Sequence, residues 1–232
     1  MKVGIIQSNY VPWRGYFDFI EEVDFFVFHD DLQYTKGDWR NRNYIKGPTG
    51  IQRLTVPVHY LRNDQLIQDT EIDYSRDWVG KHRRILENAY KNAPYFPDMM
   101  ALWLPVCEKR PRTISRLNLD LIFGICSHLG INTPMILSSI LAPNGTKTDR
   151  IIDVCKKVGA DTYVSGPAAK SYLDETALNR HGISLEWKSY AYDPYPQLFG
   201  DFIEIVSILD LIANCGPDSR ALLKSRSGSA PA

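Results

Sequence analysis

The sequence predicts an α/β fold with a mostly parallel sheet flanked by helices and a helical segment inserted in the middle of the chain. Apolar, β-prone runs at 2–6 and 24–28 are separated by helical apolar spacing. A helix, a glycine turn and a β-branched run follow one another over 151–164, so a second parallel pair with a right-handed crossover is expected. Between these units, about 76–129 keeps the three- and four-residue apolar spacing of helices.

Length and composition favour one domain. A chain of 232 residues suits a single well-buried α/β core better than two, so residues 1–223 are predicted to form one domain. Residues 224–232 are rich in serine, glycine and alanine, which predicts a disordered tail.

Charge, apolar run lengths and cysteines exclude several classes of protein. Lys plus Arg balance Asp plus Glu at 27 each, so no global field favours DNA. No apolar run approaches the roughly 18 residues of a membrane span, and the N-terminal run is too short for a signal peptide. The cysteines form no C-x-x-C pair, so reduced thiols in a cytoplasmic protein are expected, at Cys107, Cys126, Cys155 and Cys215.

Polar segments follow three of the predicted strands. In open α/β sheets the carboxyl ends of the strands form the ligand crevice, so these segments are expected to meet in one cleft. The candidates for substrate binding after the first strand are Gln7, Asn9, Tyr10 and Trp13; after a later strand they are Ser165 and Gly166.

Residues 33–50 are predicted to form a loop that mixes cations with aromatics. Arginine binds phosphate in a bidentate manner and an aromatic face stacks on a base, so the loop suits a nucleotide diphosphate. Its candidate binding residues are Tyr34, Lys36, Arg40, Asn41 and Arg42. The alternative is a solvated loop with a few anchoring aromatics.

A second candidate anion site precedes the helix predicted over 151–158. Lys147, Arg150 and the free N–H groups of the helix start would hold a phosphate, and Thr148 is the predicted N-cap. The segment is no P-loop, because G-x-x-x-x-G-K-[ST] is absent.

Acid–base residues follow the second strand as His29-Asp30-Asp31. Either aspartate, with His29 close by, would orient and deprotonate an amine. Cys215 is a candidate nucleophile, although a buried structural cysteine is the common alternative. His82 is a candidate base on a basic helix, or else a packing residue. No spacing identifies a metal site, so none is predicted.

Long motifs across the chain carry a family resemblance. QSNYVPWRGYFDFI, HDDLQYTKGDWRNRN, LTVPV, GTKTDRIIDVCKKVGADTYVSGPAAKSYL, YDPYPQLFGDF and SILDLIANCGPDS resemble the WbqC-like family of bacterial polysaccharide-cluster proteins. The resemblance implies a place in O-antigen, lipopolysaccharide and surface-sugar synthesis, with transfer of glycine or another acyl group to an amino sugar as one role. It also favours binding roles for Arg40, Asn41 and Arg42. Asp193 stands where many relatives have histidine, which argues against a universal histidine base there.

The function expected is therefore that of a transferase which acylates or aminoacylates the amino group of a nucleotide-activated sugar. The donor stays open between acyl-coenzyme A, an aminoacyl-tRNA, a carrier-protein thioester and an enzyme-formed adenylate, so tRNA or a carrier protein is a candidate partner. One alternative is a nucleotidyltransferase-like or adenylate-forming enzyme, although the H-x-G-H histidines are missing. Another is a noncatalytic sugar-nucleotide binding or assembly protein of the same pathway.

Overall fold

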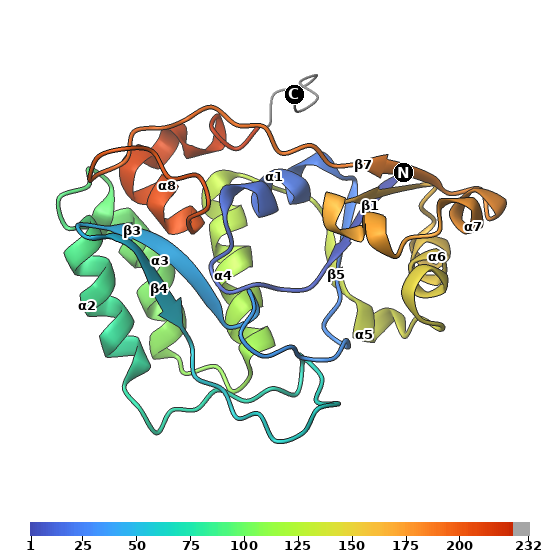
Figure 1. The fold of residues 1–232 in the computed structure, drawn as a ribbon, viewed down its shortest axis with the longest axis horizontal. Helices are drawn as coiled ribbons and strands as arrows, with labels where there is room; N and C mark the ends of the chain where they lie inside the picture. The colour runs from blue at the N-terminus through green and yellow to red at the C-terminus, as the bar shows by residue number, and fades with distance from the viewer. Residues whose placement is uncertain (225–232) are drawn as a thin grey trace.

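The computed structural model describes residues 1–224, so all but the first residue of the predicted tail lies outside the described residues. Its main sheet is parallel throughout and has the strand order β5-β2-β1-β6-β7 (Figure 1). The strands are β1 (Lys2–Ile6), β2 (Phe25–Phe28), β5 (Met135–Leu137), β6 (Thr162–Ser165) and β7 (Ser184–Trp187). The predicted α/β class with a parallel sheet is confirmed.

Strand β1 is where the order of the sheet reverses. The chain leaves β1 through α1 (Arg14–Glu22) and returns as β2 on one side, whereas β6 pairs with β1 on the other side. The register places Val3 between Phe25 and Tyr163. In parallel sheets the crevice at such a reversal lies outside the carboxyl ends of the strands.

Alternating side chains of the sheet point into two hydrophobic cores, one on each face. Phe26, Phe28 and Val164 pack on the side of α1 and the inserted helices, while Val3 and Tyr163 pack on the opposite side. The second side is covered by α6 (Lys147–Val158) and α7 (Glu175–Arg180), which bury apolar side chains against it. Successive side chains of a strand point to opposite faces, and both faces of this sheet are covered. The strands are therefore continuous apolar runs in the sequence.

The inserted segment forms three helices, α2 (Trp78–Tyr90), α3 (Phe96–Glu108) and α4 (Ile114–Leu129). They pack beside α8 (Ile208–Cys215) and a two-stranded antiparallel hairpin (Figure 1). The hairpin strands are β3 (Arg42–Gly47) and β4 (Gly50–Thr55). The prediction of a loop through residue 50 was therefore wrong from Arg42 onward, because the buried side chains of Asn43 and Ile45 alternate with outward-facing ones.

Short elements complete the fold. α5 (Ser138–Leu141) and η1 (Pro167–Ser171) follow the carboxyl ends of β5 and β6, whereas η2 (Gly216–Arg220) packs against α8 and α4. The prediction of Thr148 as the N-cap of α6 was wrong by two residues, since Thr146 holds that place without a side-chain bond. Thr148 lies one residue inside the helix, where its Oγ1 accepts the Asp174 N–H at 3.0 Å.

Candidate functional site

A cavity of about 490 Å³ lies at the reversal of strand order, and we call it the polar cavity after the charged and polar residues in its mixed lining. It takes residues from the ends of β1, β2 and β6, from the start of α6 and from η1. Its lining consists of Ile5, Ile6, Gln7, Phe19, His29, Leu32, Lys147, Arg150, Ile151, Tyr163, Ser165, Gly166, Ala168, Ala169 and Tyr172. Six of the predicted binding or catalytic residues are thus brought together, at the place where open α/β sheets bind ligands.

Asp30, next to the cavity residue His29 in the sequence, has a structural role. Its carboxylate accepts the backbone N–H of Ser139 at 3.0 Å and the Ser139 hydroxyl at 2.6 Å, and it is 2% exposed. The Ser138 hydroxyl lies 3.3 Å from the same carboxylate. These bonds occupy Asp30 at the start of α5, so it is poorly placed to take a proton from a ligand.

Asp31 is paired with Arg150. The Arg150 guanidinium and the Ser138 hydroxyl both donate to its carboxylate. Partial burial opposes ionisation, but these hydrogen bonds and the arginine charge outweigh it, so the pKa of Asp31 lies below its usual value. Arg150 also donates to the Pro143 carbonyl at 2.9 Å, which fixes the guanidinium at the cavity wall.

His29 is the acid–base group that remains available. Burial, followed by the positive charge of Arg150, lowers the pKa of its imidazole to about 4, so the ring is neutral near pH 7. The side chain is 8% exposed, and its buried Nε2 has no hydrogen-bond partner within residues 1–224. A neutral imidazole nitrogen with a vacant position can accept a hydrogen bond or a proton from a ligand in the cavity.

The first turn of α6 contributes positive charge to the cavity. Lys147 is exposed and makes no ion pair with any residue that the structure describes. Its φ of 48° and the φ of 80° at Gly145 form a tight turn before the helix. Because no side chain caps this helix start, its free N–H groups add to the charge of Lys147 and Arg150.

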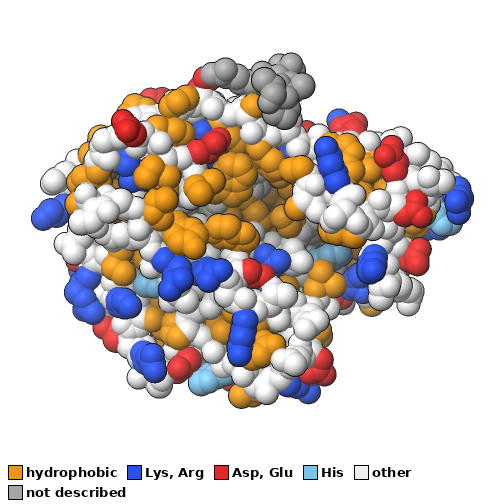
Figure 2. All heavy atoms as spheres, viewed as in Figure 1, with side chains coloured by type: hydrophobic (Ala, Val, Ile, Leu, Met, Phe, Trp, Pro, Cys, Tyr) orange, Lys and Arg blue, Asp and Glu red, His pale blue; other side chains and the backbone are white. Residues whose placement is uncertain are grey.

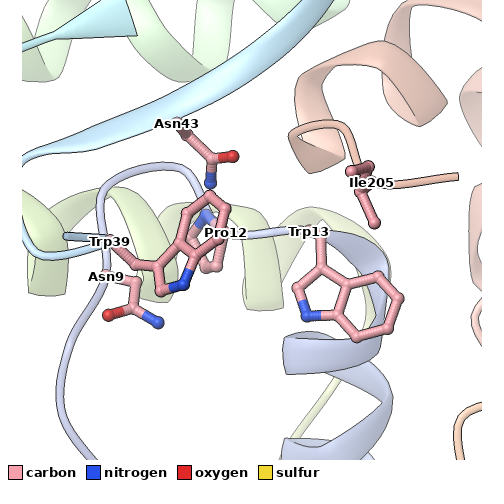
Figure 3. Close-up of a pocket in the computed structure, with 6 residues that line it drawn as sticks. All are labelled: Asn9, Pro12, Trp13, Trp39, Asn43 and Ile205. Atoms are coloured by element: carbon pink, nitrogen blue, oxygen red, sulfur yellow. The ribbon is translucent and has the colours of Figure 1, made fainter. Parts of the chain in front are cut away.

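A second, smaller cavity of about 180 Å³ has aromatic walls. Two of its lining residues, Asn9 and Trp13, were predicted to bind substrate; the others are Pro12, Trp39, Asn43 and Ile205 (Figure 3). On the face shown in Figure 2 the surface is hollowed over α1, and hydrophobic side chains gather there. The sequence predicted a single cleft, whereas the structure has two cavities there, one polar and one aromatic.

Comparison with known proteins shows to which family this chain belongs. The model of the WbqC-like protein family matches residues 7–222. The chain belongs to the WbqC-like family. It is similar to the uncharacterized protein Rv1507c of Mycobacterium tuberculosis, with 44% identity over 226 residues that cover 96% of this chain and 97% of the relative. No solved structure matched.

Several residues of the family motifs stabilise the loops around the site. Arg40 donates to Asn9 Oδ1 at 2.9 Å, and Asn41 donates to the Val56 carbonyl at 2.8 Å. Arg42 packs over Gly37, with its Nη1 3.3 Å from the position that a Cβ there would occupy. The structure places these three side chains outside both cavities.

Two more loop residues of the predicted set both contact Tyr60. Tyr34 is buried, its ring contacts Tyr60, and burial raises its pKa. Lys36 is exposed and stacks 4.2 Å from the centroid of the Tyr60 ring. Neither lines a cavity, and their contacts are those of a packed surface loop.

Tyr10 and His82 lie in the core of this WbqC-like protein. His82 Nδ1 lies 3.1 Å from the Tyr10 hydroxyl, and His82 Nε2 accepts the Thr55 N–H at 3.1 Å. Burial lowers the pKa of His82 to about 4, and the Trp103 indole donates to Tyr10 at 2.9 Å. With both ring nitrogens engaged inside the protein, His82 has the contacts of a packing residue.

Cys215 ends α8 and is buried, 7% exposed. Burial, with a smaller effect of Asp210, raises the pKa of its thiol to about 11, so the thiolate is scarce near neutral pH. Cys215 lines neither cavity, and His29 is not among the groups that shift its pKa. The described arrangement therefore offers no activated cysteine pair at this position.

Trp39 and Asn43 are site residues that the sequence reasoning missed. Both lie in the motif HDDLQYTKGDWRNRN, close to the cations Lys36, Arg40 and Arg42 that were predicted to bind phosphate. A tryptophan within a polar segment was the available sequence signal, and the structure leaves Trp39 46% exposed. Within residues 1–224, no group of three or more His, Cys, Asp or Glu side chains is arranged to hold a metal, and no helix is long and apolar enough to cross a membrane.

Proposed function

We propose that this protein transfers an acyl or aminoacyl group, such as glycyl, to the amino group of a nucleotide-activated amino sugar in surface polysaccharide synthesis. One observation carries the proposal: His29, whose neutral imidazole has an Nε2 without a partner in the described residues, lines the same cavity as Lys147 and Arg150. A base beside a phosphate site suits an acceptor that carries both a diphosphate and an amine. Membership of the WbqC-like family agrees with this assignment.

His29 would act as the general base. The amine nitrogen attacks the acyl carbonyl carbon, a C–N bond forms, and the bond from that carbon to the sulfur or oxygen of the donor breaks. The proton lost by the amine passes to His29 Nε2 and from there to the leaving group. A bound diphosphate would raise the pKa of the imidazole above about 4, toward the range in which a base is effective.

The aspartates would position the site. Asp31 holds the Arg150 guanidinium, and Asp30 fixes the start of α5 behind it. Lys147 and Arg150 would bind the phosphates, while Gln7, Ser165 and Gly166 would border them from the ends of β1 and β6. An acyl-coenzyme A, an aminoacyl-tRNA or a carrier thioester each provides an acyl carbon with a suitable leaving group.

The test is turnover of uridine diphosphate amino sugars with each donor class, followed by mass spectrometry. His29→Gln should lower kcat by about 10²- to 10⁴-fold, the range for one acid–base group, with KM for the sugar nucleotide changed only a few-fold. His128→Gln, an exposed histidine at the end of α4, is the matched control. Equal kcat for His29→Gln and the wild type would remove His29 from the mechanism.

A noncatalytic role in the same pathway would give a different result. Sugar nucleotides would then bind to the wild type, as calorimetry would show, while no donor would yield a product of increased mass. Binding of ATP or CTP with release of diphosphate would instead indicate nucleotidyl transfer.

A further inference from the structure

The aromatic cavity is built from three separate segments of chain. Trp13 and Pro12 come from the loop after β1, Trp39 precedes β3, and Ile205 precedes α8. Figure 3 shows the two indoles on opposite sides of the space, with Asn43 above Trp39 in the view and Asn9 below it. Its volume of about 180 Å³ is enough for a planar ring system.

The walls of this cavity are held rigidly. Val11 is fully buried and has a φ of 37°, a strained backbone for a β-branched residue. Asn43 Nδ2 fixes that turn by donating to the Tyr10 carbonyl at 3.0 Å and to the Val11 carbonyl at 2.9 Å. The Tyr10 N–H donates to the Trp39 carbonyl at 2.9 Å, which ties the two tryptophan-bearing segments together.

The polar groups facing the cavity are mostly donors. Asn9 Oδ1 is occupied by Arg40, so the amide nitrogen turns toward the space between the indoles, as Figure 3 shows. Neither that nitrogen nor the indole N–H of Trp13 or Trp39 has an acceptor in the part of the chain that the structure describes. Asn43 Oδ1 accepts the Tyr44 N–H at 2.8 Å and keeps a second lone pair.

Tyr190 contacts a residue of the aromatic cavity and lies close to a residue of the polar cavity. The Trp13 and Tyr190 rings lie 5.3 Å apart, and the Tyr190 hydroxyl lies 3.6 Å from where a Cβ on Gly166 would sit. Asn9 in one cavity is also only two residues from Gln7 in the other, about 7 Å of extended chain. Residues of the two cavities are therefore neighbours, as the base site and the diphosphate site of one nucleotide must be.

We infer that the aromatic cavity binds the uracil or thymine base of the nucleotide, with the base in contact with the rings of Trp13 and Trp39. Such a base presents two carbonyl acceptors and one N–H, which match the donors of Asn9 and the indoles and the free lone pair of Asn43. Cytosine, adenine and guanine each carry an exocyclic amino group, and the cavity offers few acceptors for it. The inference rests on the proposed function, because it names the nucleotide whose phosphates meet Lys147 and Arg150.

Calorimetric titration with UDP, ADP and inorganic diphosphate tests the inference. The wild type should bind UDP more tightly than ADP or diphosphate. Trp39→Ala should weaken UDP binding by about 5- to 150-fold, the effect of losing one stacking face, and leave diphosphate binding unchanged. Trp39→Phe should recover most of the affinity, because it keeps a stacking ring.

Trp187→Ala is the matched control, because Trp187 is 37% exposed and lines neither cavity. The base assignment would be overturned if Trp39→Ala bound UDP as tightly as the wild type does, or if the wild type bound UDP and ADP equally. The proposed function would still stand in either case, provided that the wild type bound diphosphate. Failure of the wild type to bind either UDP or diphosphate would overturn both.

Discussion

At the scale of single residues, the chemistry of the site depends on which ionisable groups the fold already occupies. Three acid–base residues follow β2 in sequence, yet Asp30 bonds to Ser139, and Asp31 pairs with Arg150. Of these three residues, only His29 lines the cavity and has a buried side-chain atom without a hydrogen-bond partner in residues 1–224. The identity of the base therefore depends on contacts with residues more than a hundred positions away, which a local motif does not reveal.

Asp30 and Asp31 should differ in their effect on stability. Asp30→Ala should lower the free energy of unfolding by about 1–3 kcal/mol, because it leaves buried donors of α5 without an acceptor. Urea denaturation measures this, and Asp64→Ala, an exposed aspartate, is the control. Wild-type stability of Asp30→Ala would contradict the structural role and return Asp30 to the list of catalytic candidates.

The buried imidazole of His29 should make stability depend on pH. Its pKa is lowered from 6.5 to about 4, so the unfolded chain binds a proton between these values that the folded chain does not. Stability contributed by the neutral ring is present above pH 6.5 and is lost as the pH falls toward about 4. Between pH 7 and 4 the wild type should lose roughly 3 kcal/mol more than His29→Gln. Parallel losses in the two proteins, by chemical denaturation, would show that His29 is not held neutral.

At the scale of elements, the first turn of α6 is predicted to bind phosphate. Lys147→Ala should weaken binding of inorganic diphosphate by about 1.5–3 kcal/mol, the range for a charge-assisted hydrogen bond. Lys156→Ala, in the last turn of the same helix, should bind as the wild type does. Equal affinities of all three proteins in calorimetry would mean that Lys147 only solvates the turn.

The start of α1 positions the wall of the aromatic cavity. A Cβ on Gly15 would lie 2.4 Å from the Trp13 ring, so Gly15→Ala should displace that indole. UDP binding should weaken while diphosphate binding stays as in the wild type, and overpacking should cost about 1–3 kcal/mol of stability. Gly124→Ala, where a Cβ meets open space on α4, is the control. Unchanged UDP affinity of a folded Gly15→Ala protein would argue against Trp13 as a stacking wall.

Periodicity predicted the elements with strong patterns and missed those that depend on distant partners. The apolar runs of β1 and β2 and the helical spacing of residues 76–129 were read correctly. Strand β3 was missed because its outward residues Arg42, Tyr44 and Lys46 are polar or aromatic, and its inward Asn43 is polar as well. Lys46 is nevertheless buried, since it donates to the carbonyls of Gly200 and Asp201.

At the scale of the whole molecule, the strand order brings the site together. The rule that ligands bind at the carboxyl ends of parallel strands predicted a cleft from Gln7, His29 and Ser165, and all three line the polar cavity. The same reasoning failed for Tyr10, because Val11 turns the backbone with a positive φ and sends Tyr10 into the core. Sequence adjacency to a strand end does not show to which side of a turn a side chain points.

A crystal structure of the complex with a uridine diphosphate amino sugar tests the central claim most directly. The account predicts the diphosphate within hydrogen-bond distance of Lys147 and Arg150, and the sugar amine within about 3.2 Å of His29 Nε2 or joined to it by one water. A sugar nucleotide bound with its diphosphate away from both cations, or with its amine out of reach of His29, would contradict it.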